Sequence, residues 1–203
     1  MVGQSMSYDR RDLLFSFKIV ICGASSVGKT SLFNRYCFNS FNFDTSPTIG
    51  INFHSINLKI NNEKKPNEPR DYYVVNSIFD FGGQERFKPL VSQFLEGSSG
   101  GLLVFDSVNK PSFEQLDFWF EQLIKNTISP EIPIILVGSK SDLIKKTPKS
   151  EIVNDSVIND YVKEKQLEGF YNTSSLENYN VLKVFKELNN LMLKRQQIPY
   201  VVG

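Results

Sequence analysis

Short apolar runs alternate with longer amphipathic stretches along most of this chain. Runs rich in branched or aromatic residues, each typical of a strand, cover residues 13–22, 51–60, 72–79, 101–105, 134–137 and, weakly, 169–171. Between them, apolar residues spaced by three and four predict helices over residues 29–37, 87–95, 112–128, 150–165 and 181–194. This alternation implies crossover connections. It therefore predicts an α/β fold, with a six-stranded, mostly parallel sheet and helices on both faces.

Two stretches interrupt this pattern and suggest where the domain begins and ends. Residues 61–70 are polar, contain two prolines and separate two strand-like runs without a helix, so we expect a long, solvated hairpin loop. Near the C-terminus, Pro199 ends the last predicted helix, and a short apolar run follows it. The pattern thus divides the chain into an N-terminal extension over residues 1–12, a single domain over 13–197 and a C-terminal tail over 198–203.

Composition narrows the class of protein. The 203 residues carry 23 Lys and Arg against 22 Asp and Glu, and this net charge of +1 argues against a protein that coats nucleic acid. Two cysteines are too few for a disulfide scaffold, and no run approaches the roughly eighteen apolar residues of a membrane span. The first residues resemble neither a signal peptide nor a myristoylation site. We therefore expect a cytoplasmic protein with no nucleic-acid partner.

A phosphate-binding motif follows the first predicted strand. Gly23-Ala-Ser-Ser-Val-Gly28-Lys29-Thr30 fits the pattern G-x-x-x-x-G-K-(S/T), whose glycines let backbone N–H groups approach phosphates. Lys29 can reach the outer phosphates, the Thr30 hydroxyl can bind Mg²⁺, and the following helix directs its positive end at the same anion. The alternative is a glycine-rich turn with a chance lysine, and the flanking strand and amphipathic helix argue against it.

Further motifs occur in a fixed order and together resemble a small GTPase of the Ras superfamily, with greatest similarity to the Rab branch. Ser46-Pro-Thr48-Ile-Gly-Ile-Asn-Phe53 resembles the first switch, and Asp80-Phe-Gly-Gly83-Gln84-Glu-Arg-Phe87 resembles the second. Ser139-Lys140-Ser-Asp142 stands where the family has N-K-x-D, and Thr173-Ser174-Ser175-Leu176 stands where it has T-S-A-K. The resemblance covers residues 15–194 and implies the P-loop small GTPase fold.

This resemblance implies a role for each matching residue, with GTP or GDP as the bound nucleotide and Mg²⁺ as its metal. The implied nucleotide-binding residues are Gly23, Ser25, Ser26, Val27, Gly28, Lys29, Thr30, Ser31, Phe41, Thr48, Gly83, Lys140, Asp142, Ser174, Ser175 and Leu176. The implied metal ligands are Thr30, Thr48 and Asp80, and Gln84 is the implied catalytic residue that orients the attacking water. For Phe41, which stands where the family packs an aromatic against guanine, an ordinary core or surface role stays open.

The guanine-recognition motif departs from the family pattern. Asp142 keeps the carboxylate that can accept hydrogen bonds from guanine, but Ser139 replaces an asparagine that contacts the base and ties this loop to the phosphate loop. Losing one buried hydrogen-bonding group costs about 1–3 kcal/mol, so we expect weakened rather than abolished nucleotide binding. Near the terminal phosphate, Phe81 and Gly82 replace the usual Thr and Ala, so we expect this departure to affect the hydrolysis rate more than nucleotide binding.

These features predict a Rab-like molecular switch that hydrolyses GTP slowly with Mg²⁺, a class of protein that acts in vesicular traffic. The alternative is a degenerate GTPase that serves as a nucleotide-binding or interaction module with little hydrolysis. A third candidate, an ATP-using P-loop enzyme, is disfavoured by Asp142. The resemblance also implies effector and regulatory proteins as partners at the switches, with Phe53 and Phe87 as docking aromatics.

The C-terminal residues lack the cysteines that carry prenyl groups in most of the family. This chain therefore has no lipid-anchor motif, and two explanations stay open: the protein is not prenylated, or the chain is part of a longer protein. Under the second, Tyr200-Val-Val-Gly203 echoes Ile19-Val-Ile-Cys-Gly23 and would begin a second such domain. We expect any membrane association to depend on a partner or on a missing C-terminal region.

Overall fold

A computed structural model of the chain describes residues 13–43, 48, 50–62, 64, 71–83, 88–127 and 132–203. In this part of the chain the strands are β1 (Leu13–Cys22), β2 (Ile51–Asn62), β3 (Tyr72–Phe81), β4 (Gly100–Asp106), β5 (Ile134–Ser139), β6 (Phe170–Asn172) and β7 (Tyr200–Val202). The helices are α1 (Lys29–Phe38), α2 (Lys88–Leu95), α3 (Lys110–Glu114), α4 (Leu116–Asn126), the 3-10 helix η3 (Ser141–Lys146), α5 (Asp155–Glu164) and α6 (Val181–Arg195). None of these helices is long and apolar enough to cross a bilayer.

The strands form one sheet in the order β6-β5-β4-β1-β3-β2-β7. β1 pairs in parallel with β3 and β4, and β5 pairs in parallel with β4 and β6, whereas β2 is antiparallel to both β3 and β7. The predicted α/β class and mostly parallel sheet are confirmed. The predicted count of six strands is wrong, because the described residues form a sheet of seven. The added strand, β7, lies in the segment expected to be a tail, and its three residues are too few to show an alternating pattern.

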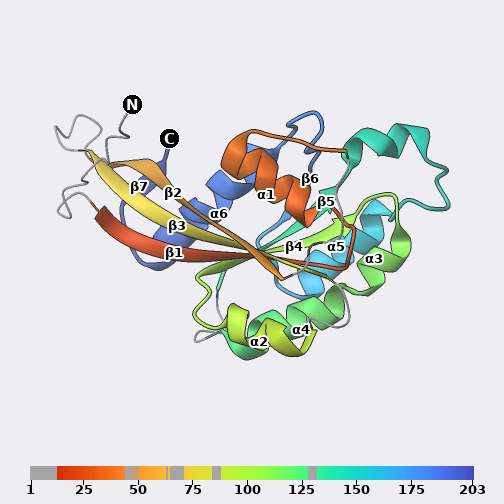
Figure 1. Cartoon of the computed structure of the whole chain (residues 1–203), viewed down its shortest axis with the longest axis horizontal. Coiled ribbons are helices and arrows are strands. Elements are labelled where there is room, and N and C mark those ends of the chain that lie inside the picture. Colours follow the sequence, from red (N-terminus) through yellow and green to blue (C-terminus); the bar gives the residue numbers. More distant parts are fainter. Residues whose placement is uncertain are drawn as a thin grey trace.

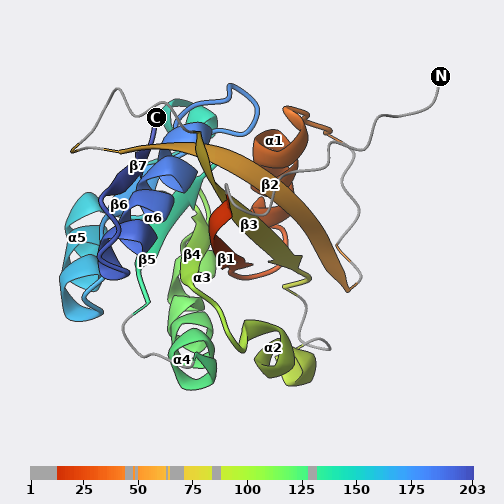
Figure 2. The same cartoon turned by 90° about the vertical axis from the view of Figure 1, so that its left-hand side faces the viewer.

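Helices cover both faces of the sheet, as predicted (Figures 1 and 2). On one face, α1 and α6 contribute Leu32 and Phe185 to a buried apolar cluster. On the other face, α4 and α5 contribute Trp119 and Ile158 to a second cluster. α1 also stacks directly on α6, because the rings of Tyr36 and Phe185 lie parallel with centroids 3.7 Å apart. The sheet is therefore buried on both sides, which explains the continuous apolar runs of its central strands.

The helices depart from the sequence prediction by more than one residue at three places. The single helix expected over residues 112–128 is two helices, α3 and α4, which meet at Gln115. The helix expected from residue 150 begins as α5 at Asp155, because the Asn154 side chain accepts a hydrogen bond from the Ser156 N–H and caps it. The helix η3, which begins directly after Lys140, was not predicted.

Opposite ends of β2 serve different parts of the molecule. Its first residues pair with the end of β3, from Ile51 opposite Phe81, and its later residues reach Ile60 opposite Tyr72. This antiparallel pair agrees with the expected hairpin, although residues 65–70 of the expected loop lie outside the described part of the chain. β7 pairs with residues 60–62 of β2, and the ring of Tyr200 packs edge-on against Tyr72. The extra strand thus lies at the end of β2 remote from Thr48.

Candidate functional site

The candidate site lies at the carboxyl ends of the parallel strands, the edge where open α/β sheets bind ligands. A cavity of about 420 Å³ opens there. Most of the predicted nucleotide-binding residues line it: Ser25, Ser26, Gly28, Lys29, Thr30, Ser31, Phe41, Thr48, Gly83, Lys140, Asp142, Ser175 and Leu176. The structure therefore brings together residues from segments far apart in the sequence.

Other predicted residues support this cavity from beside it: Gly23, Val27, Asp80 and Ser174 are not part of its lining. Gly23 has a φ of +150°, and an added Cβ would lie 2.1 Å from the carbonyl oxygen of Val104, so the chain turns out of β1 against β4. The predicted catalytic residue, Gln84, and the predicted docking residue Phe87 lie outside the described residues.

Lys29 lies inside the phosphate loop. Its side chain is buried, and Nζ donates hydrogen bonds to the carbonyl oxygens of Gly23 at 2.8 Å and Ala24 at 2.6 Å. Burial lowers the pKa of Lys29 to about 8, while the nearby Asp80 carboxylate acts in the opposite direction. A buried ammonium group costs free energy unless it is paired, so an anionic ligand in this loop would be stabilising.

The predicted metal ligands form one hydrogen-bonded group. Thr30 Oγ1 donates to Asp80 Oδ2 at 2.6 Å, and Thr48 Oγ1 lies 2.7 Å from Thr30 Oγ1. Because the single hydroxyl hydrogen of Thr30 points to Asp80, Thr48 is the donor in the second bond. Asp80 Oδ1 is buried and has no hydrogen-bond partner among the described residues. An all-oxygen set with one unpaired carboxylate oxygen fits a hard cation such as Mg²⁺.

The ionisation of Asp80 reflects this buried setting. Burial raises the pKa of the carboxyl group, and hydrogen bonds from Thr30 and Asn52, together with the charge of Lys29, act against that rise. A divalent cation at the free oxygen would favour the ionised form further.

Lys140 and Asp142 lie on the other side of the cavity, at the start of η3. Lys140 Nζ forms an ion pair with Asp106 Oδ2 at 2.7 Å and donates to the carbonyl oxygen of Ser26 at 2.9 Å. Asp142 Oδ1 accepts a hydrogen bond from Ser174 Oγ at 2.6 Å. Since a carboxylate can accept several hydrogen bonds, this contact orients Asp142 without exhausting its capacity to bind a base.

Ser139 keeps part of the role that its family counterpart, an asparagine, would have. Its Oγ lies 2.5 Å from the carbonyl oxygen of Val27 and 3.0 Å from that of Phe105. One hydroxyl hydrogen is therefore shared between the phosphate loop and β4. The connection to the phosphate loop persists in a shorter form, whereas the longer reach of an amide toward a base is lost.

Three residues that hold parts of the site in place were not among the predicted site residues. Arg35 Nε donates to the carbonyl oxygen of Ser175 at 2.7 Å, Asn52 Nδ2 donates to Asp80 Oδ2 at 2.9 Å, and Asp106 pairs with Lys140. Asp106 could have been found, because a carboxylate that ends a buried strand at the ligand-binding edge is a useful signal. The contacts of Arg35 and Asn52 depend on how distant segments pack, and no local pattern reveals them.

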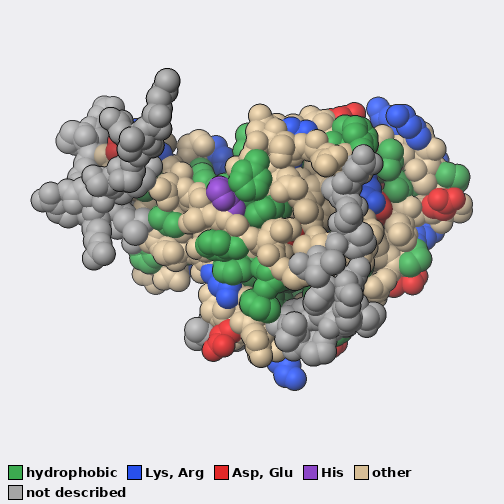
Figure 3. Space-filling view, viewed as in Figure 1, with side chains coloured by type: hydrophobic (Ala, Val, Ile, Leu, Met, Phe, Trp, Pro, Cys, Tyr) green, Lys and Arg blue, Asp and Glu red, His purple; other side chains and the backbone are tan. Residues whose placement is uncertain are grey.

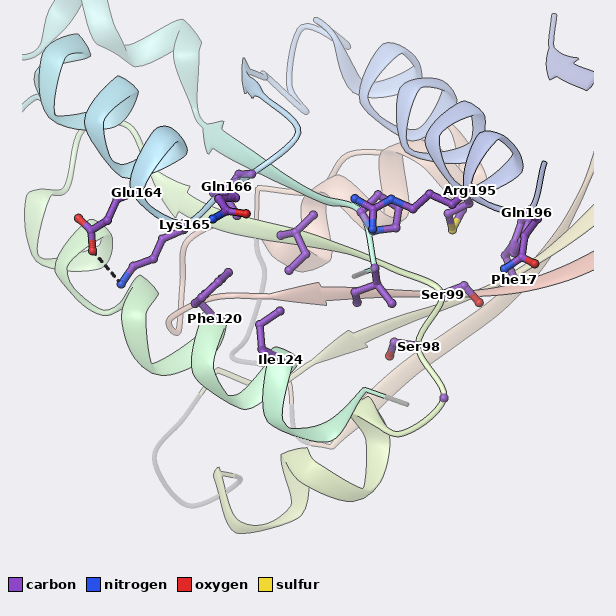
Figure 4. Close-up of a pocket in the computed structure, with 16 residues that line it drawn as sticks. Phe17, Ser98, Ser99, Phe120, Ile124, Glu164, Lys165, Gln166, Arg195 and Gln196 are labelled. Atoms are coloured by element: carbon purple, nitrogen blue, oxygen red, sulfur yellow. Dashed lines mark ion pairs between the residues drawn. The ribbon is translucent and has the colours of Figure 1, made fainter. Parts of the chain in front are cut away.

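A second and larger cavity, of about 860 Å³, lies at the opposite edge of the sheet, where β4 and β5 begin (Figure 4). Two of its lining residues are cations held by carboxylates: Lys165 pairs with Asp117 at 3.0 Å and Glu164 at 3.2 Å, and Arg195 pairs with Glu168. It contains none of the predicted site residues. Cavity size alone therefore does not locate the phosphate-binding site.

Comparison with known proteins finds matches over most of the chain. The profile described as Ras family matches residues 18–194. The chain is 35% identical over 179 residues to Ras-related protein RABA1b of Arabidopsis thaliana, which covers 87% of this chain and 75% of the relative. It is 33% identical over 188 residues to Ras-related protein Rab-27B of Bos taurus, covering 92% of this chain and 84% of the relative. The chain belongs to the Ras family and is a Rab-like small GTPase.

Proposed function

We propose that the 420 Å³ cavity binds GTP or GDP together with Mg²⁺ and that the bound nucleotide controls the choice of protein partners. Ras-family GTPases bind these nucleotides with Mg²⁺ as a class, and the assignment of individual residues is the proposal made for this chain. One observation supports it above all: a buried ammonium group, Lys29, lies beside a buried carboxylate, Asp80, that has one oxygen unpaired. A cation and an anion that both lack full compensation suit a ligand made of phosphates and a metal ion.

The phosphate loop and its metal ligands would hold the phosphates. Backbone N–H groups of the loop and the start of α1 face the anion, and Lys29 exchanges its carbonyl partners for phosphate oxygens. Thr30, Thr48 and Asp80 would hold Mg²⁺ directly or through its water ligands, and the metal supplies charge neutralisation at the phosphates. Gly83, which lines the cavity, would offer its N–H to the terminal phosphate. A side chain does not fit at this position, since an added Cβ would lie 2.5 Å from the backbone of Ala24.

The opposite side of the cavity would bind the base. Asp142 would accept hydrogen bonds from guanine, which adenine cannot offer in the same arrangement, and the stem of Lys140 would pack over the ring. Phe41 lines the cavity and packs edge-on against the exposed Phe43. The backbone from Ser174 to Leu176 would face the base edge, and its position is fixed by the Arg35 contact to Ser175.

Hydrolysis would proceed by attack of a water molecule on the terminal phosphorus. The new P–O bond forms as the bond to the β-phosphate oxygen breaks, which leaves GDP and inorganic phosphate. Gln84 would orient this water, an assignment that rests on the motif alone. The sequence contains no recognisable arginine finger of its own. We therefore propose that an activating protein accelerates the reaction.

Partner proteins would bind next to the switches. Figure 3 shows hydrophobic side chains gathered beside the histidine on this face of the molecule. Phe38 packs against His54 and is 53% exposed, and Phe53 packs against Phe79 and is 56% exposed. Loss of the terminal phosphate would release Thr48 and alter this surface. Together with the Rab-type relatives, this supports a role in vesicle traffic.

The same proposal treats residues 13–197 as the nucleotide-binding domain and residues 1–12 as an extension before it. β7 lies beyond residue 197 but belongs to the same sheet, since it is paired with β2.

Titration with a fluorescent GDP, with and without Mg²⁺, tests nucleotide binding. The proposal predicts Mg²⁺-dependent binding, with GTP an effective competitor and ATP a poor one. Competition by ATP at parity with GTP would contradict the guanine assignment to Asp142. Equal partner binding in the GDP and GTP-analogue states would contradict the switch and favour an interaction module.

Single-turnover GTP hydrolysis tests the catalytic assignment. Gln84→Leu should slow hydrolysis while fluorescent GDP binding stays unchanged, because the proposed role of Gln84 begins only with the attacking water. An unchanged hydrolysis rate in this variant would remove Gln84 from the mechanism.

A further inference from the structure

Asn52 lies directly opposite Asp80 in the antiparallel pair of β2 and β3. Their side chains therefore lie on the same face of the sheet, the face on which α1 begins. Asn52 Nδ2 donates to Asp80 Oδ2 at 2.9 Å, the same oxygen that accepts the Thr30 hydroxyl at 2.6 Å. Oδ2 therefore accepts two hydrogen bonds, and the buried Oδ1 has no hydrogen-bond partner among the described residues.

The two oxygens of the Asp80 carboxylate are thus used unequally, and this has a chemical consequence. The two donors fix the rotation of the carboxyl group, because both bind the same oxygen from different elements. The unoccupied oxygen is then held in one direction rather than sampling several. In metal sites, a partner that orients a ligand carboxylate in this way contributes to metal affinity without touching the metal.

The amide suits this position because it is an uncharged donor. Its Nδ2 group can face a carboxylate, whereas its carbonyl oxygen could not without repulsion, so the orientation of the amide follows from its partner. An alanine here would leave Oδ2 with one donor fewer, and a leucine would keep the size of the side chain without the donor.

Asn52 also connects the metal site with the switch. Thr48 lies four residues before it in the chain. The hydrogen bonds run from Thr48 to Thr30, from Thr30 to Asp80 and from Asn52 to Asp80. Nearby, the Gly82 N–H donates to the carbonyl oxygen of Gly50 at 3.0 Å, which joins the same two segments through the backbone.

We infer that Asn52 is a positioning residue that holds Asp80 in the orientation required to bind Mg²⁺, and so controls how strongly Mg²⁺ retains the nucleotide. This inference rests on the function proposed above. It assigns a role to a residue near the end of the first-switch motif, to which the resemblance gave none.

The test measures release of N-methylanthraniloyl-GDP from the full chain across a series of free Mg²⁺ concentrations. In Asn52→Ala and Asn52→Leu, the Mg²⁺ concentration for half-maximal retention should rise about 10- to 100-fold. In excess EDTA both variants should release nucleotide at the parent rate, because Asp80 then has no metal to bind. Asn57→Ala is the matched control, an exposed asparagine on the same strand, and should leave the Mg²⁺ dependence unchanged.

A Mg²⁺ dependence equal to that of the parent in both Asn52 variants would overturn the inference. So would release that accelerates by the same factor with and without Mg²⁺, because that result indicates general loosening of the site. Far-ultraviolet circular dichroism identifies any variant that fails to fold, and the leucine variant preserves side-chain volume if alanine is not tolerated. If the parent itself binds no GDP, or releases it independently of Mg²⁺, the proposed function fails as well.

Discussion

Removing the hydroxyl of Ser139 should have an effect of predictable size, because this hydroxyl is a single donor between two buried segments. Ser139→Ala removes the hydrogen bond to the Val27 carbonyl and the shared bond to Phe105. Ser139 and Val27 are both buried, so water cannot easily replace the lost donor. Leaving such a carbonyl unsatisfied costs about 1–3 kcal/mol, and we expect the free energy of unfolding to fall by that amount.

The cost should divide between stability and nucleotide binding. The hydrogen bond joins two segments of the protein itself, so most of the loss belongs to the fold. The remainder appears as weaker binding, since a loosened phosphate loop must be ordered again by the ligand. Because about 1.4 kcal/mol corresponds to tenfold in an equilibrium constant, a tenfold rise in the dissociation constant for GDP is the upper part of the expected range.

Urea unfolding followed by the fluorescence of Trp119, the only tryptophan, measures the first quantity, and titration with fluorescent GDP measures the second. Ser141→Ala, a change at the less buried serine that begins η3, is the control and should alter neither by more than about 0.5 kcal/mol. If Ser139→Ala is as stable as this control, the Ser139 hydroxyl does not connect the two segments.

Three further changes address other parts of the fold. Gly83→Ala places a Cβ 2.5 Å from the Ala24 backbone, so urea unfolding should show a loss of about 1–3 kcal/mol. Tyr200→Ala removes the ring contact with Tyr72 and should cost about 1–2 kcal/mol in the same assay, with GDP affinity unchanged because β7 is remote from the cavity. Burial raises the pKa of Cys22 to about 12, so at pH 8 iodoacetamide should modify this thiol only after unfolding, as mass spectrometry would show. The contribution of Cys22 to the free energy of unfolding is complete below pH 9, where the thiol is protonated in both states. It is lost between pH 9 and about 12, because only the unfolded protein releases the proton in that range.

The elements that the sequence predicted well are those whose environment is uniform along the strand or helix. β4 is buried at every position, so a continuous apolar run was sufficient to find it. The phosphate loop was equally clear, since its glycines, Lys29 and Thr30 are adjacent in the chain. Both β4 and the phosphate loop are determined mainly by residues that are neighbours in the chain, so a local sequence pattern is enough to identify them.

Features that depend on distant pairing escaped the sequence analysis. β7 is a strand only because residues 60–62 of β2 offer it an edge, and three residues carry no periodic signal of their own. Asn52 acquires its contact with Asp80 from the register of two strands joined by a long connection. Ser139 was correctly identified as a departure, but its contact with Val27 could be seen only once β5 and the phosphate loop were placed side by side.

The contacts that hold α1 in place suggest which residues around the 420 Å³ cavity would move when the bound nucleotide changes. Behind the helix, the ring of Tyr36 is stacked on Phe185 of α6, and Arg35 holds the loop that carries Ser175. Moving α1 would break both contacts at once, so we expect this helix, which begins with Lys29 and Thr30, to stay in place when the bound nucleotide changes. Under the proposed function, the one phosphate group that distinguishes GTP from GDP would then act on Thr48, whose hydroxyl contacts that of Thr30. A small change in ligand length would therefore displace the segment of Thr48, next to the surface proposed for partner proteins, rather than α1.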